Sequence, residues 1–352
     1  MTRFEFDTFA VFSSIVLSLG FSTLRFEESR QPGTVTVTVF DSLSRNPLPN
    51  ADVADLASGQ NRITDENGRA YLQLPSSGKL QLRVRQIGYQ PRRVDFTGAP
   101  PGNAVNVALE RVAYVLETVQ STGRCSTDVD SAMSGVSAIA LGQLKQAAEK
   151  YNEFRRVYPF EATIERRTAA VPGDGDIKRM TVSEEKFGSE KFEVRYRPGH
   201  VIEGRFGEFL VPILFISTLA DSVFWNHHCF AARSFESYKG ARVIRLEFEP
   251  TADVDGPDYK GAALLDSATS MLLRVEFELA NPPRRNGPRK LDGYTTFMSP
   301  SPFVVLPDTT GAEWWLRTPD TDEHFRPDYV QVLFMKDVTY KKGKPPGYSE
   351  SK

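Results

Sequence analysis

Histidines near carboxylates are the residues of this sequence best suited to catalysis. His200 and Glu203 have the His-x-x-Glu spacing of a zinc site, and His324 could supply the second imidazole. A catalytic zinc also needs an open coordination position and a carboxylate that acts as general acid and base, in a fold that fixes them. This part of the chain has the pattern of β-strands instead, so we expect the His-x-x-Glu spacing to occur by chance.

A second candidate group for metal binding is His227, His228 and Cys229, since adjacent imidazoles and a thiolate suit zinc or copper. Neighbouring residues of a strand point to opposite faces, so at most alternate members of this group can converge on one ion. The sequence contains no G-x-S-x-G elbow, P-loop or Rossmann glycine pattern. We therefore expect a non-catalytic protein with no catalytic residue, no metal and no cofactor.

The two cysteines, Cys125 and Cys229, form an even and sparse set that is compatible with one disulfide bridge in an oxidising compartment. Chain-entropy arguments assign about 4–5 kcal/mol of stabilisation to a bridge that closes a loop of this size. Two buried thiols are the alternative. The disulfide is the prediction if the protein is exported.

The most apolar stretch after the N-terminus lies between residues 209 and 230 and is rich in aromatic side chains. Core packing is the first interpretation of such a stretch. A hollow that binds a lipid or a partner protein is the second. The candidate apolar ligand-binding surface consists of Phe209, Phe215, Phe224 and Trp225.

Composition limits the kind of protein that positions these residues. The length of 352 residues predicts about two domains. The 43 basic and 45 acidic side chains nearly cancel. No net field attracts nucleic acid, so we expect no nucleic-acid partner.

The N-terminus has the features of a secretory leader. Residues 8–24 carry no charge and lie between Arg3 and Arg25. This run is shorter than the roughly 20 apolar residues of a spanning helix. We predict a signal peptide over residues 1–24, with an uncleaved membrane anchor or an ordinary apolar helix as the alternatives. Only an uncleaved N-terminus would contact the membrane.

Residues 32–120 have the pattern of a β-sandwich. Short alternating strands, such as Thr34–Phe40 and Leu80–Val84, recur about every ten residues without helical patterns between them. Asn67 and Gly68 predict a hairpin-type turn, because glycine can supply a positive φ.

The same segment resembles the carboxypeptidase regulatory-like domain, a transthyretin-like β-sandwich. The matching motifs are the turn Pro47–Val53, the turn Thr64–Gly68 and the corner Ile87–Tyr89. The resemblance implies an accessory module of an exported or envelope protein, without an active site of its own. It also gives the His-x-x-Glu spacing a further interpretation, a divergent zinc carboxypeptidase-like hydrolase, which stays an alternative.

The rest of the chain reads as a linker, a helix and a second strand-rich domain. Residues 121–137 are small and polar, and residues 138–158 have the apolar spacing of one helix that Pro159 ends. Strand patterns extend from there to residue 341, and the tail 342–352 is predicted to be disordered. The fold class is mainly β: an N-terminal transthyretin-like β-sandwich, then a C-terminal α+β antiparallel sheet over residues 138–341 with one main helix.

Two further resemblances concern this C-terminal region. The hairpin Lys260–Ala280 resembles the repeating hairpin of the LolA-like family, whose curved antiparallel sheet wraps a helix to form an apolar half-barrel for lipid. The order of parts, with Gly123–Cys125 before the helix and Asp221–Phe230 after it, resembles uncharacterised exported proteins of Gram-negative soil bacteria. These have a cysteine at both places, which supports a pairing of Cys125 with Cys229.

Together these features predict an exported protein that is periplasmic or associated with the outer membrane. We expect a non-catalytic binding or structural protein of the cell envelope, whose partner is an envelope protein, a glycan or a lipid. A module associated with TonB-dependent transport is the alternative, because Val112–Arg124 resembles the stretch that follows this domain in TonB-dependent receptors.

Overall fold

The structure is a computed structural model that describes residues 33–75, 78–114, 135–170, 180–190, 195–205, 208–210, 214–283, 287–316 and 327–349. The chain divides into two compact units, Met1–Pro32 and Gly33–Lys352. The predicted signal peptide over residues 1–24 belongs to the first unit and lies outside the described residues. In the described part of the chain, no helix is both long and apolar enough to cross a membrane.

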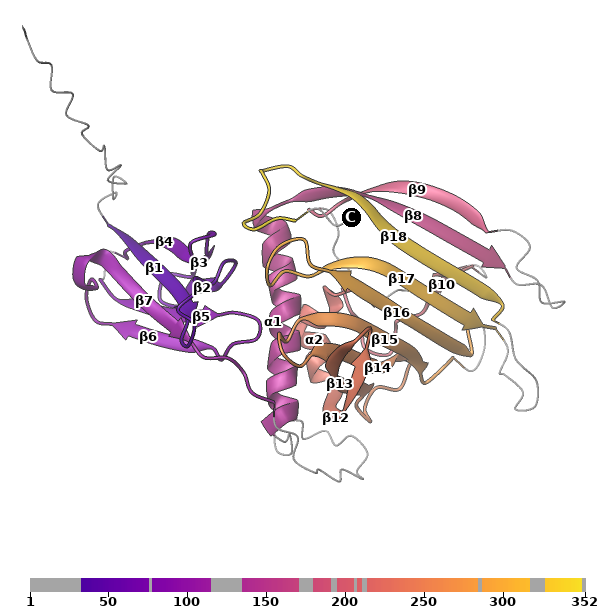
Figure 1. Cartoon of the computed structure of the whole chain (residues 1–352). Helices are drawn as coiled ribbons and strands as arrows, with labels where there is room; N and C mark the ends of the chain where they lie inside the picture. The colour runs from indigo at the N-terminus through magenta and orange to yellow at the C-terminus, as the bar shows by residue number, and fades with distance from the viewer. Residues whose placement is uncertain are drawn as a thin grey trace, which may run out of the picture. The chain divides into compact units, whose positions relative to one another are not determined.

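The N-terminal strands form the predicted β-sandwich of two sheets (Figure 1). Its strands are β1 (Thr34–Asp41), β2 (Asp52–Asp55), β3 (Gln60–Ile63), β4 (Arg69–Gln73), β5 (Leu80–Arg85), β6 (Arg92–Phe96) and β7 (Ala104–Leu109), and a short 3-10 helix, η1 (Pro101–Asn103), precedes β7. In one sheet β1 lies between β4 and β7, antiparallel to β4 and parallel to β7. The other sheet has the strand order β3-β2-β5-β6.

Alternation of β-branched residues builds the core of the sandwich. Val35, Val37 and Val39 are fully buried, whereas the threonines between them are half-buried. β-Branched side chains suit this pleated, half-buried geometry. Burial of each valine contributes about 1.5–3 kcal/mol. Leu80 and Val84 of the opposite sheet complete the same core.

The predicted turn at Asn67 and Gly68 differs from its expected form. The carboxylate of Asp65 accepts hydrogen bonds from the backbone N–H groups of Asn67 and Arg69, at 2.9 and 2.8 Å. Gly68 has the expected positive φ, +69°, and a Cβ there would lie 2.4 Å from the carbonyl oxygen of Val39. However, β3 and β4 on the two sides of the turn belong to different sheets. The prediction of a hairpin is therefore wrong, because the turn carries the chain from one sheet to the other.

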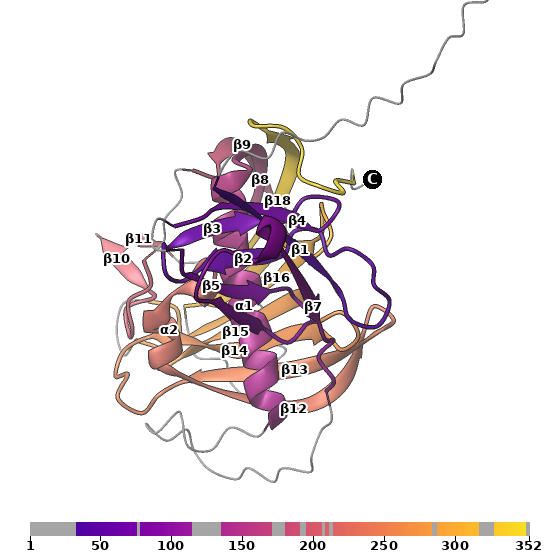
Figure 2. The same ribbon diagram turned by 90° about the vertical axis from the view of Figure 1, so that its left-hand side faces the viewer.

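The C-terminal strands form one nine-stranded sheet in which every neighbouring pair is antiparallel. Its order is β12 (His228–Tyr238), β13 (Ala241–Pro250), β14 (Asp258–Asp266), β15 (Leu272–Ala280), β16 (Lys290–Met298), β17 (Leu306–Trp315), β18 (Tyr329–Tyr340), β8 (Phe160–Ala170) and β9 (Thr181–Gly188). The helix α1 (Gly135–Val157) confirms the predicted helix over residues 138–158, and the strands wrap around it (Figure 2). Shorter elements are β10 (Glu203–Arg205), β11 (Glu208–Leu210), η2 (Thr218–Ala220) and α2 (Ser222–Asn226).

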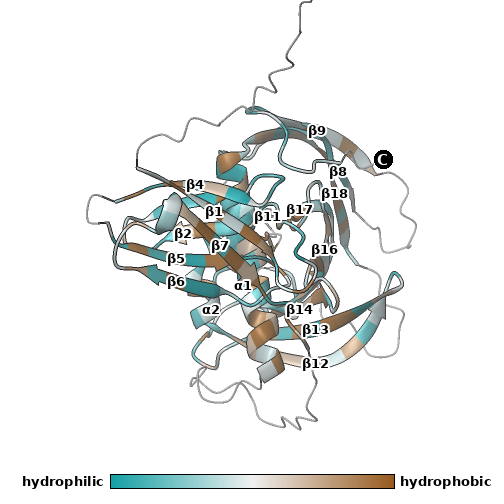
Figure 3. Ribbon diagram, turned by 60° about the vertical axis from the view of Figure 1, so that its left-hand side comes forward, coloured by the Kyte–Doolittle hydropathy of each residue, from teal (hydrophilic) through white to brown (hydrophobic). Residues whose placement is uncertain are grey.

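The helix α1 and one face of this sheet share an apolar core. Ala140, Leu144 and Ala148 are buried on α1 at the four-residue spacing of one helix face. On β15, Val275 and Phe277 are buried in the same core, at the two-residue spacing of one strand face. Figure 3 shows bands of hydrophobic and hydrophilic colour along the strands and along α1.

The structure describes residues 342–349 of the predicted disordered tail, 342–352, and places them against the sheet. The backbone N–H of Ser349 donates a hydrogen bond to the carbonyl oxygen of Pro300 at 2.9 Å. Tyr348 packs edge-on against Tyr340 of β18, with ring centres 5.5 Å apart. The disorder of this tail stays a prediction.

Candidate binding surface on the outer face of the sheet

The nine-stranded sheet has a polar face that points away from α1, which we call the outer face. Side chains alternate along a strand, so Arg274, Glu276 and Glu278 of β15 lie on the outer face, opposite Val275 and Phe277. The register continues this face across the next strands, since Glu276 is paired with Tyr294 and Tyr294 with Gly311. Direct neighbours in register share a face.

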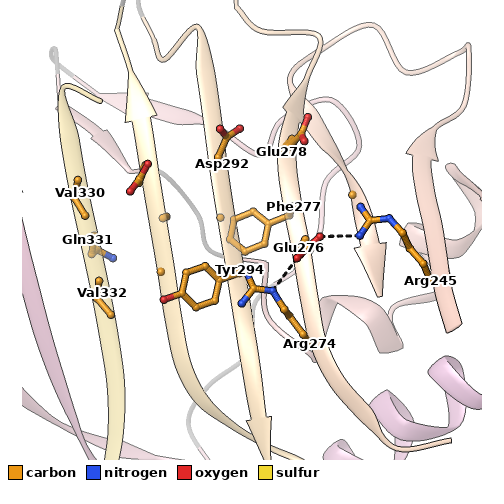
Figure 4. Close-up of a pocket in the computed structure, with 15 residues that line it drawn as sticks. Arg245, Arg274, Glu276, Phe277, Glu278, Asp292, Tyr294, Val330, Gln331 and Val332 are labelled. Atoms are coloured by element: carbon orange, nitrogen blue, oxygen red, sulfur yellow. Dashed lines mark hydrogen bonds and ion pairs between the residues drawn. The ribbon is translucent and has the colours of Figure 1, made fainter. Parts of the chain in front are cut away.

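A hollow of about 360 Å³ lies on the outer face (Figure 4). Gly311 of β17 opens it, because it has no side chain between Tyr294 of β16 and Val332 of β18. The ring of Tyr294 lies so near that a Cβ at Gly311 would be 2.6 Å from it. The hollow is lined by Arg245, Gly261, Arg274, Glu276, Phe277, Glu278, Asp292, Gly293, Tyr294, Gly311, Ala312, Glu313, Val330, Gln331 and Val332.

One end of the hollow is a paired charge cluster. Glu276 accepts hydrogen bonds from Nη1 of Arg245 and from Nε of Arg274, both at 2.9 Å (Figure 4). Partial burial opposes ionisation of Glu276, but the two guanidinium groups outweigh it and hold the pKa of this carboxyl below its usual range. The guanidinium of Arg274 also lies over the ring of Tyr294, 4.2 Å from its centre. Both arginines are therefore already engaged.

The other end of the hollow carries three carboxylates on neighbouring strands. Glu278, Asp292 and Glu313 are direct neighbours in register across β15, β16 and β17. Glu278 pairs with Lys260 at 2.9 Å, and Asp292 pairs with Lys290 at 2.6 Å. Glu313 has no ion-pair or hydrogen-bond partner among the residues that the structure describes. We call these three residues the acidic row. Two of the three charges are therefore already balanced by lysines, and Glu313 is the carboxylate of the row that is open to a cation.

This arrangement suits a ligand with a positive group on an apolar stem. The acidic row faces the positive group, and Val330 and Val332 on β18 offer apolar contact to the stem, as apolar surface does for a lysine side chain. The lining contains no serine, threonine, cysteine, histidine or lysine; its ionisable groups are two arginines, four carboxylates and the phenol of Tyr294. Within the described ranges, no three His, Cys, Asp or Glu side chains are grouped to hold a metal ion.

Of the residues of the predicted zinc spacing, the structure describes His200 and the backbone of Glu203. His200 is exposed, and its Nδ1 lies 2.8 Å from the carbonyl oxygen of Pro198. Glu203 is the first residue of β10. His324 lies outside the described residues.

His228 is a buried residue whose contacts are structural. Its Nδ1 lies 3.0 Å from the carbonyl oxygen of Phe224, and its Nε2 lies 2.8 Å from that of Tyr259. Burial lowers the pKa of the imidazole, although Asp258, with a carboxylate oxygen 3.6 Å from Nε2, opposes this. His227 is half-buried, with Nδ1 2.8 Å from the carbonyl oxygen of Val223.

Cys229 lies on β12, opposite Glu249 of β13. Its predicted disulfide partner, Cys125, lies outside the described residues. The bridge therefore stays a prediction.

The residues of the candidate apolar surface lie mostly in the core. Phe224 is fully buried and its ring stacks on that of His228, with centres 3.9 Å apart. Trp225 is buried beside it, and Phe215 is half-buried against the same core. Phe209 is in β11, opposite Gly204 of β10. An apolar ligand-binding surface at these residues stays a prediction.

The sequence analysis missed the hollow. The alternation Arg274, Glu276 and Glu278 along one strand could have indicated a charged sheet face. It could not indicate that Asp292 and Glu313 stand next to Glu278, because that depends on the register of two later hairpins.

Comparison with known families agrees with the resemblance of the sandwich. The model of the carboxypeptidase regulatory-like domain matches residues 34–110, so this part of the chain is such a domain. No curated protein matches the chain.

Solved structures give weaker similarities. A domain described as an outer membrane lipoprotein-sorting protein from Vibrio parahaemolyticus has 15% identity and a TM-score of 0.31, over 56% of this chain and 94% of its own. A LolA superfamily protein from Nitrosomonas europaea has 13% identity and a TM-score of 0.31, over 57% and 94%. A membrane-associated protein of unknown function from Bacteroides fragilis has 11% identity and a TM-score of 0.18, over 90% and 98%. TM-scores of this size carry no argument about the sheet.

Proposed function

Because residues 34–110 are a carboxypeptidase regulatory-like domain, we propose that this protein is a non-catalytic binding protein of the bacterial cell envelope. The sandwich is its accessory module, and the nine-stranded sheet binds the partner on its outer face. The observation that carries the proposal is the hollow at Gly311, whose lining offers charge, an aromatic ring and apolar contact. Such a lining suits the binding of a charged side chain.

The partner that fits best is an envelope protein that presents a lysine or arginine side chain. Its charge would lie at the acidic row, where Glu313 has no partner within the described chain. Its methylene stem would lie against Val330 and Val332. A neutral glycan or a lipid tail would leave Glu313 without a positive partner, so these two ligand classes are less suited to this hollow.

Fluorescence anisotropy with two labelled nonapeptides tests the binding site. One peptide carries three lysines separated by valine and serine, and the other carries glutamates at the lysine positions. We expect the lysine peptide to bind at low salt and the glutamate peptide not to bind. Glu313→Gln should weaken binding about two- to fivefold, which corresponds to a surface charge contact of up to about 1 kcal/mol.

The matched control is Glu185→Gln, the same change at an exposed ion-paired residue of β9, away from the hollow. It should leave peptide binding unchanged. Equal binding by wild type and Glu313→Gln, or an equal loss in Glu185→Gln, would exclude the acidic row as the binding site. Cleavage of either peptide, detected by its mass after incubation, would contradict a non-catalytic role.

Expression with the native N-terminus in a Gram-negative host tests the envelope location. We expect the protein in the periplasmic or membrane fraction, with the mass of a chain lacking its leader and two hydrogens lighter than the reduced chain. Recovery of a full-length, reduced chain from the cytosol would contradict both export and the disulfide between Cys125 and Cys229.

A further inference from the structure

Lys150 of α1 is a buried lysine without an ionic partner. Only 6% of the residue is exposed to solvent. The ammonium nitrogen Nζ donates a hydrogen bond to Oε1 of Gln86 and lies 5.9 Å from the centre of the Phe303 ring. No carboxylate of the described chain lies within ion-pair distance of it. A protonated lysine has three N–H donors, and this site supplies one acceptor.

Lys150 lies where the corner Gln86–Tyr89 of the sandwich packs against α1. On α1, the side chain of Gln143 accepts a hydrogen bond from the N–H of Gly88 at 2.7 Å and donates one to the carbonyl oxygen of Tyr89 at 3.3 Å. Gly88 has a φ of +83°, and a Cβ there would be 2.6 Å from the carbonyl oxygen of Thr269. The corner is therefore a close-fitting contact between the sandwich and the C-terminal domain.

The charged groups around Lys150 are largely paired with one another. Arg85 of β5 binds Oδ2 of Asp52 on β2 through Nε and Nη2, at 2.9 and 2.6 Å. The same guanidinium reaches Glu149 of α1 at 2.6 Å. The segment Ser299–Val304, which brings Phe303 to this place, has no titratable side chain. The positive charge of Arg85 opposes a positive charge on Lys150. Asp52 favours that charge, but Asp52 is already paired with Arg85.

We propose that Lys150 makes the docking of the sandwich on α1 dependent on pH, so that docking strengthens as the lysine loses its proton. A neutral amine needs only the hydrogen bond to Gln86, whereas a buried ammonium with unpaired donors is costly. Burial lowers the pKa of Lys150 to about 7, below the ordinary 10.5. The undocked state therefore binds the proton more tightly, and docking becomes more favourable from about pH 7 up to about pH 10. Below pH 7 both states are protonated and the dependence ends.

Hydrogen exchange of the full chain between pH 6 and pH 9.5, corrected for the intrinsic exchange rate, tests the proposal. The probe is the peptide that contains the N–H of Gly88, which is protected only while it is bonded to Gln143. We expect the opening constant of this peptide to fall by close to tenfold per pH unit above pH 7.5, the slope for one proton, and to level off below pH 7.

Lys150→Met keeps a side chain of similar length without a proton to lose, and it should abolish the slope. Lys145→Met is the matched control, the same change on the same helix at a residue whose Nζ lies over Trp225. It should keep the slope of wild type. A wild-type opening constant independent of pH would overturn the proposal. So would an NMR-measured Lys150 pKa near 10, and this readout needs no variant to fold.

Discussion

The two faces of the nine-stranded sheet differ in chemistry although the same strands make both. On the face toward α1, Phe277 is buried and its ring lies over Gly293 of the next strand. On the outer face, one strand further along, the half-buried ring of Tyr294 lies over Gly311. An aromatic ring therefore packs over a glycine on both faces. On one face the helix covers this ring, and on the other face solvent reaches it.

This difference separates stability from recognition. A side chain on the face toward α1 contributes through packing that cannot rearrange without loss of contact. A side chain on the outer face can move into solvent, so its replacement changes the shape and charge of the hollow more than the free energy of unfolding. Equivalent substitutions on the two faces can test whether stability depends on one face and binding on the other.

The largest expected effect is that of Phe277→Ala. Its ring is buried and lies 5.8 Å from that of Tyr259, so its removal leaves a cavity that the surrounding core cannot fill. We expect a loss of about 3–5 kcal/mol in the free energy of unfolding, measured by urea denaturation. Tyr294→Ala removes a ring from the outer face, where the main loss is the contact with Arg274, and should cost about 1 kcal/mol or less. Equal losses in the two variants would remove the distinction between the faces.

How far the sequence predicted this fold depended on whether the signal was local. The alternation Thr34–Phe40 and the helical spacing up to Pro159 are each contained in one segment, and both elements are where the patterns put them. The turn at Gly68 was also found, because its positive φ is a local demand. Which sheet the next strand joins is decided by burial elsewhere in the sandwich, and there the hairpin prediction was wrong.

The candidate site could not be predicted from the sequence, because it too depends on contacts between distant segments. The acidic row exists because β15, β16 and β17 are aligned so that Glu278, Asp292 and Glu313 are neighbours. A bulge between Thr296 and Phe297 shifts that alignment further along β16, and a shift of one residue would move a carboxylate to the opposite face. The burial of Lys150 could not be predicted for another reason. A lysine in a helical pattern is ordinarily exposed to solvent, and this one is buried where Gln86 of the sandwich packs against it.

A smaller effect is expected from adding one methyl group on either face. In Gly293→Ala the new Cβ would lie 2.3 Å from the buried ring of Phe277, so the core must shift, at a cost of about 1–3 kcal/mol. In Gly311→Ala the Cβ would lie 2.6 Å from the ring of Tyr294, which can swing toward solvent, and we expect a cost below about 1 kcal/mol. Urea denaturation measures both.

The same pair of glycine variants also bears on binding. Gly311→Ala fills the hollow and should weaken binding of the lysine peptide. Gly293 also lines the hollow, but its new methyl group would meet the buried ring of Phe277, so Gly293→Ala should weaken binding less. A loss of stability in Gly311→Ala as large as that in Gly293→Ala would mean that the ring of Tyr294 is held as firmly as that of Phe277.

The smallest expected effect concerns the charge of Glu276 and appears as a pH dependence. The native pKa of this carboxyl is lowered because Arg245 and Arg274 bind its ionised form, against the effect of partial burial. A lowered native pKa means that the unfolded chain takes up the proton first as the pH falls below about 4.5. The contribution of Glu276 is therefore complete at neutral pH and is lost on acidification. Because the side chain is partly exposed, we expect about 1 kcal/mol or less.

Glu276→Gln should lower stability by that amount at pH 7 and by less at pH 3.5, while Glu278→Gln, at an exposed carboxylate two residues along, should change little at either pH. Urea midpoints of the three proteins at the two pH values measure this. A penalty for Glu276→Gln that stays constant between pH 7 and pH 3.5 would mean that packing of the side chain, rather than its charge, holds Arg245 and Arg274 together. The outer face would then resemble the face toward α1 more than the distribution of charge suggests.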